Sequence, residues 1–244
     1  MPRMVIALLT VVLTLTACGS VTGSAGGAKW FSEPHARKLA TAVARGDKTT
    51  IATLVADGAD PDARGTEDLT MLQWSIMSSS ADGMAGLLEA GADPDLVGRD
   101  GAAPLSNAAF NRGVRFVELL LSAGADPDVR ETMTGDTPLK IACLQRDAPV
   151  FMMLLEAGAD PDGADENSDA VIHTCARVNA GDLVLLLLQS GADPEATTSS
   201  GASFQDYYFS YPKNVLNEAS LAQRATLIQW LEDHAIPVVP QAFS

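Results

Sequence analysis

Apolar residues recur along the chain in short amphipathic runs, and the order of these runs repeats about every 33 residues. The nine residues LLEAGADPD occur at Leu87–Asp95 and again at Leu154–Asp162, and three close copies end at Asp62, Asp128 and Glu195. The glycines of the five copies are separated by 33, 33, 34 and 33 residues. A fixed period of this length is typical of stacked units that cannot bury their apolar faces alone.

Each copy predicts the end of a helix. Two leucines close an amphipathic run, the glycine provides a left-handed C-cap, and the following Asp-Pro cannot continue a helix. A second pattern, clearest in DGAAPLSNAAF at Asp100–Phe110, precedes each copy at a fixed distance. Each unit is therefore expected to contain a turn, a short helix with a pair of small residues, a tight connection and a second apolar helix.

This pattern resembles the ankyrin repeat, in which T-P-L-H begins the first helix and L-L-x-x-G-A-D ends the second. The resemblance covers residues 29–237 and implies an all-α solenoid of stacked helix pairs joined by hairpin-like turns. T-P-L-H is complete nowhere: only His173 stands at the histidine position, where the other units have Gln73, Ser106 and Lys140. We expect about six units, with atypical first and last units because each has one face in water, and a short tail at 238–244.

The first 28 residues predict an exported, lipid-anchored protein. The apolar run Val5–Leu15 is too short to span a membrane and matches a secretory signal. Residues 15–18, LTAC, resemble the lipobox of bacterial lipoproteins, so residues 1–18 are the expected signal and Cys18 the lipidated residue. The alternative is an ordinary cleaved signal with an incidental cysteine. Residues 19–28 would form a Gly/Ser tether. Resemblance to lipoprotein sorting in Gram-negative bacteria implies an outer-membrane anchor that faces the periplasm.

Charge narrows the possible partners. The chain has 16 basic and 31 acidic residues, which gives a net charge of −15. A balance this acidic argues against nucleic acid or anionic lipid headgroups as direct ligands. It favours a cationic protein partner, although the same charge is also accounted for by solubility alone.

The two remaining cysteines, Cys143 and Cys175, are predicted to stay reduced. Each falls in the pair of small residues of a first helix, in consecutive units. Stacked helices lie roughly 10 Å apart, whereas a disulfide requires Cα atoms within about 7 Å. Both thiols are therefore expected to be small buried apolar groups.

No residue pattern predicts an enzyme, a metal site or a bound cofactor. The three histidines, His35, His173 and His234, lie in different units and have no ligand spacing. The Asp-Pro-Asp turns lack the glycine and the distal glutamate of a calcium-binding EF-hand loop, and their repetition identifies them as turns. Neither a glycine-rich phosphate loop nor a G-x-S-x-G nucleophile motif is present.

A binding surface is expected where the copies differ. Large apolar residues occupy first-helix positions that are normally polar, and the turns carry charges of mixed sign. The alternative for the apolar residues is that they pack between neighbouring first helices. The predicted partner-binding residues are Trp74, Met77, Phe110, Asn111, Ile141, Leu144, Arg177, Arg99, Asp100, Arg130 and Glu131.

The sequence is compatible with two functions. Short exported ankyrin lipoproteins resemble the immunity proteins that bacteria keep against their own antibacterial effectors, notably the phospholipase effectors of type VI secretion. This resemblance implies a tethered periplasmic inhibitor that blocks an effector sterically, without chemistry. The alternative is a general periplasmic scaffold for envelope assembly or the oxidative-stress response.

Overall fold

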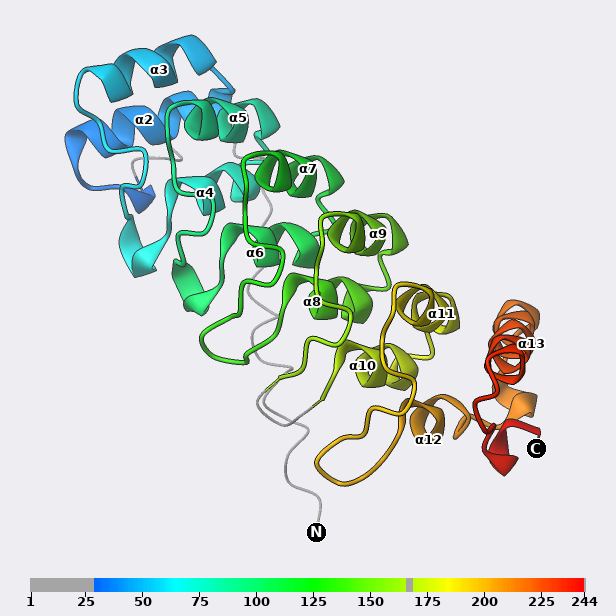
Figure 1. Cartoon of the computed structure of the whole chain (residues 1–244). Helices are drawn as coiled ribbons and strands as arrows, with labels where there is room; N and C mark the ends of the chain where they lie inside the picture. The colour runs from blue at the N-terminus through cyan, green and yellow to red at the C-terminus, as the bar shows by residue number, and fades with distance from the viewer. Residues whose placement is uncertain (1–28, 166–168, 244) are drawn as a thin grey trace.

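The computed structural model describes residues 29–165 and 169–243. Within them the chain is a two-layered stack of antiparallel helix pairs without β-strands (Figure 1). The inner layer holds the first helix of each pair: α2 (Pro34–Arg45), α4 (Met71–Met77), α6 (Pro104–Phe110), α8 (Pro138–Gln145), α10 (Val171–Arg177) and α12 (Phe204–Tyr208). The outer layer holds the second: α3 (Lys48–Ala56), α5 (Ala81–Glu89), α7 (Val114–Ser122), α9 (Ala148–Glu156), α11 (Gly181–Gln189) and α13 (Glu218–Asp233). The expected all-α solenoid is confirmed.

The repeated glycines end the outer helices as expected. Gly91 and Gly158 have φ angles of 94° and 93°, in the left-handed region. After Gly91, the N–H of Ala92 donates to the carbonyl oxygen of Leu87 at 3.0 Å and closes the helix end. A Cβ atom at either glycine would meet nothing within 4 Å, so the requirement for glycine is conformational.

The Asp-Pro-Asp turns join neighbouring repeats through their carboxylates. The Oδ1 of Asp62 accepts the backbone N–H of Asp93 at 2.9 Å, and Asp95 accepts that of Asp126 in the next repeat at 2.9 Å. The same bond recurs in the two following repeats. Burial, together with neighbouring carboxylates, raises the pKa of Asp62 and Asp95. These aspartates are thus structural residues of the stack, as the repetition predicted.

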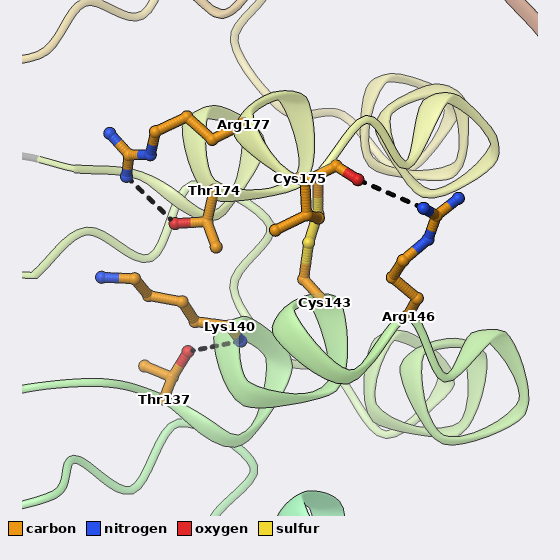
Figure 2. The surroundings of a disulfide bond; sticks show 8 residues. Thr137, Lys140, Cys143, Arg146, Thr174, Cys175 and Arg177 are labelled. Atoms are coloured by element: carbon orange, nitrogen blue, oxygen red, sulfur yellow. Dashed lines mark hydrogen bonds between the residues drawn. A yellow bond between two sulfur atoms is a disulfide. The ribbon is translucent and has the colours of Figure 1, made fainter. Parts of the chain in front are cut away.

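One prediction is wrong: Cys143 and Cys175 form a disulfide between α8 and α10 (Figure 2). Their Cα atoms are 5.5 Å apart, although the helices belong to different repeats. Cα atoms lie about 2.3 Å from a helix axis. Two residues that face each other across axes roughly 10 Å apart therefore approach to about 5.4 Å. Cys143 is the second residue of its small pair and Cys175 the first of its pair, so they face each other.

The last unit closes the core with aromatic residues. Phe204, Tyr208 and Phe209 are buried against the final repeat. Arg224 of α13 is also buried, and its guanidinium donates to the carbonyl oxygen of Tyr211 at 2.7 Å. Burial raises the pKa of Tyr208 to about 12.

At the N-terminal end, the described residues begin at Lys29. The predicted signal, the Cys18 lipidation site and the tether therefore lie outside the described residues.

Candidate protein-binding surface

Three apolar side chains form an exposed row along the inner layer. Met77, Phe110 and Leu144 are 43%, 53% and 46% exposed. They stand at the same place in three successive repeats, in the last turns of α4, α6 and α8. The two residues just before each of them are buried between helices, which leaves this position to project away from the stack. We call Met77, Phe110 and Leu144 the apolar strip.

Two residues expected on this surface belong to the core instead. Trp74 is only 2% exposed, and its Nε1 donates to the backbone oxygen of Ala40 at 2.8 Å. Its ring also meets Phe31 edge-on, with the ring centres 6.3 Å apart. Ile141, at the same position of α8, is buried as well. This helix position points toward a neighbouring helix, so a large side chain there fills the space between repeats.

Beyond Leu144, the position of the apolar strip changes from apolar to charged. Arg177, the last residue of α10, pairs with Asp169 at 2.7 Å, and its guanidinium lies 5.1 Å from the centre of the Tyr207 ring. Asn111, which follows Phe110, is exposed and bonds the carbonyl oxygen of Asn107 at 2.7 Å. Asn111 and Arg177 therefore border the strip at its polar side and its far end.

The predicted charged rim is present at the hairpin-like turns, and only part of its charge is paired. Arg99 contacts Glu67 at 2.9 Å and Asp100 at 3.5 Å. Arg130 donates to the backbone oxygen of Ala164 in the next turn at 2.6 Å. Glu131 accepts a hydrogen bond from the Thr134 hydroxyl. Burial raises the pKa of the Glu131 carboxyl. Arg99 and Asp100 therefore form an ion pair, whereas Arg130 and Glu131 are held by neutral groups.

The comparisons with known proteins agree with this architecture. A family model described as ankyrin repeats (3 copies) matches residues 39–131 and 105–198, which together cover more than half of the chain. The chain belongs to the ankyrin-repeat family. The comparison with curated protein sequences finds no match.

A solved structure supports the same assignment. The fold is similar to the structure described as "Crystal structure of the ankyrin repeat domain of Bcl-3: a unique member of the IkappaB protein family", with a TM-score of 0.67 and 25% identity. The match covers 79% of this chain and 85% of that chain. Ankyrin repeats are typically non-enzymatic interaction domains, and no catalytic family is indicated. The chain is thus a scaffold for protein binding.

The histidines of this ankyrin array have local structural roles. His35 is exposed beside Glu33 at 3.2 Å, and His234 stacks on Trp230 with ring centres 3.9 Å apart. His173 is buried, and its Nε2 lies 3.1 Å from the backbone oxygen of Ala196 in the next turn. In the part of the chain that the structure describes, no three His, Cys, Asp or Glu side chains gather as a metal site would require. No described helix has both the length and the hydropathy of a membrane span.

The sequence analysis did not identify three exposed residues that lie near the candidate binding surface. Met133, which is 78% exposed, lies in the one turn that is a residue longer than the others. The 34-residue interval was the signal for that extra residue. Arg112 and Arg146 follow the apolar strip residues of α6 and α8 by two positions and are exposed. Both have positive φ angles, 55° and 51°, which place them in a left-handed turn between the two helices of their pair.

Proposed function

We propose that this ankyrin protein is an exported, lipid-anchored inhibitor of the periplasm. In this proposal it captures one antibacterial effector of phospholipase type, delivered by type VI secretion, and blocks it sterically. The leader with its lipobox at Cys18 supports the location. The single observation that carries the inhibitory role is the apolar strip, since it offers exposed anchors for a protein partner.

The shape of the surface supports steric capture rather than chemistry. The strip crosses three repeats, and the polar side chains of Asn111 and Arg177 lie beside it. Protein interfaces share this arrangement of apolar anchors with polar residues at their border. At longer range, the net charge of −15 would attract a partner with a cationic surface and speed association. An inhibitor tethered to the membrane would meet an enzyme that attacks lipids at the place where it acts.

The direct test is inhibition of a phospholipase effector encoded beside the gene. The full-length protein, held in mixed micelles of detergent and phospholipid, is titrated into the effector while lipid hydrolysis is followed. We expect activity to fall to near zero at equimolar inhibitor. Unchanged hydrolysis at a large excess of the protein would contradict the proposal.

Matched variants locate the contact. Phe110→Ala should weaken inhibition by about 2 kcal/mol, or roughly thirty-fold, as truncation of an interface anchor does. Met152→Ala is the control, because Met152 is a similarly exposed apolar residue on the outer helix α9. Equal effects of the two variants would show that the strip is not the site.

A cellular experiment separates the inhibitor from a general scaffold. A strain without the protein should lose viability only when the effector is present. Envelope defects in the same strain without any effector would instead favour a role in envelope assembly or stress response.

A further inference from the structure

Charge is distributed unevenly across the width of the solenoid. The Asp-Pro-Asp turns follow the outer helices, so their carboxylates lie at the hairpin end of every repeat. The apolar strip lies at the other end of the inner helices, separated from that acidic row by the length of a helix, roughly 10 Å. The net negative charge of the protein therefore does not describe the surroundings of the strip.

Two arginines beside the strip have no acidic partner among the residues that the structure describes. Arg112 Nη2 donates to the backbone oxygen of Gln145 at 2.5 Å, and Arg146 Nη1 donates to that of Val178 at 3.3 Å. Neither forms an ion pair with a described carboxylate, whereas Arg115 and Arg177 do. Both are exposed, so their positive charge is available to a ligand.

We propose that the strip and these arginines bind an amphipathic helix of the partner that carries carboxylates beside its apolar residues. The proposal rests on the function proposed above, because it describes how that surface engages its partner. Phe110 and Leu144 provide apolar contacts, and Arg112 and Arg146 provide charge-assisted hydrogen bonds to carboxylates, for which the planar guanidinium is well suited.

The spacing between repeats matches the rise of an α-helix in the partner segment. Packed helices lie about 8–10 Å apart, so the strip presents an apolar side chain at about that interval. One heptad of α-helix rises about 10.5 Å. A partner helix lying along the strip would therefore place one apolar residue per heptad over Met77, Phe110 and Leu144 in turn, and residues beside each contact would reach the arginines.

An anionic bilayer is the less suitable ligand for this surface. The strip side chains are only about half exposed in the inner layer, which limits their insertion into lipid. The protein as a whole carries a net charge of −15, which opposes approach to an anionic membrane. A cationic partner and an acidic docking helix are compatible, because overall charge governs encounter and local charge governs the contact.

The test uses two labelled helical peptides that share leucines one heptad apart and differ only in having glutamate or lysine beside them. Binding to the full-length protein in micelles is measured by fluorescence anisotropy. The glutamate peptide should bind about ten-fold more tightly than the lysine peptide. Equal affinities, the opposite preference, or no binding of either peptide would overturn the proposal.

Variants then assign the binding to this surface. Arg112→Glu and Arg146→Glu should each weaken binding of the glutamate peptide about ten-fold, while Arg115→Glu on α7, with the same change in charge, should not. Thermal melts show whether each variant folds. Phe110→Ala gives a second measurement that does not touch the arginines, and Met152→Ala is its control. Binding that survives in Phe110→Ala with unchanged affinity would refute the assignment.

Bilayers of two compositions test whether the surface binds lipid rather than a peptide. If reconstitution into bilayers containing phosphatidylglycerol abolishes peptide binding, but phosphatidylcholine bilayers do not, the surface binds lipid and the proposal is wrong. The peptide experiment requires no effector. Inhibition of an effector without a preference for the glutamate peptide would refute only this inference, and the reverse result would refute only the proposed function.

Discussion

Removal of the Cys143–Cys175 disulfide should destabilise the array substantially. The best perturbation is the double variant Cys143→Ala/Cys175→Ala, because alanine already stands beside each cysteine in the small pairs of α8 and α10. The variant therefore removes the cross-link with little change in packing. The two cysteines are separated by 32 residues in sequence.

The magnitude follows from the loop that the disulfide closes. In the chain-entropy model, a cross-link over a loop of this length lowers the entropy of the unfolded chain by an amount equivalent to about 3.7 kcal/mol at 25 °C. For a protein of this size, 1 kcal/mol shifts the melting temperature by about 2–4 °C. The oxidised protein should therefore melt roughly 7–15 °C above the double variant.

Urea unfolding followed by circular dichroism measures the difference, and mass spectrometry of alkylated, unreduced protein detects the linked peptides. Both cysteines are fully buried, so a reductant should act on the folded protein only when repeats open. Stability resides in repeats and their interfaces, so the effect should concentrate in the transition that opens α8 from α10. Absence of the linked peptide pair, or equal urea midpoints for wild type and double variant, would refute the reasoning.

Four further predictions concern single residues. Trp74→Ala should lower the free energy of unfolding by about 3–5 kcal/mol, measured in urea, because it empties a buried site and removes the hydrogen bond from the indole to the carbonyl oxygen of Ala40. Cys18→Ala should abolish labelling by radioactive palmitate and release the protein from membranes; an unlabelled wild type would rule out lipidation. Ser79→Gly should raise the unfolding free energy by about 0.5 kcal/mol, because Ser79 has φ 55° and Gly46 occupies the equivalent turn of the first helix pair without strain. Asp95→Asn should raise the melting temperature at pH 7 but not below the ordinary pKa of aspartate. The folded pKa of Asp95 is raised by burial, so its ionisation at higher pH destabilises the fold, and asparagine keeps the acceptor oxygen without the charge.

The fold was predictable because the repeated residues have strict local roles. Glycine at positions such as Gly91 follows from the left-handed helix end, and the 33-residue interval follows from stacking one helix pair on the next. Register also identified Phe110, Met77 and Leu144 as departures at a variable position, and the structure places all three at the surface.

The wrong predictions concern side-chain direction. Aligning the repeats shows which positions are equivalent, but it does not show whether a side chain at that position points into the stack or away from it. Trp74 and Phe110 both occupy positions that vary between copies, yet one points between helices and the other away from them. The prediction for the cysteines fails for the same reason, because two facing residues approach more closely than the axes of their helices. Side-chain direction around a short helix decides both cases.

Neighbouring repeats of this protein are joined by different side-chain links. At the buried histidine position, Lys140 reaches across to Asp165 of the next turn at 2.7 Å, and its interactions with Asp136 and Asp165 raise its pKa despite the opposing effect of burial. The disulfide strengthens the same junction between α8 and α10. Ser106 occupies this position in α6, and its buried hydroxyl has no hydrogen-bond partner within the described ranges.

The junction between α6 and α8 therefore lacks both of these links, and it is the junction that Phe110 and Leu144 span. A ligand held by both residues would bridge two repeats that lack the ion pair and the disulfide of the next pair. Binding energy at the strip would then also stabilise the stack against opening between α6 and α8, because a ligand that requires both repeats in place binds only the closed array. Hydrogen exchange at the amides of α6 should report this coupling as slower opening when partner is bound.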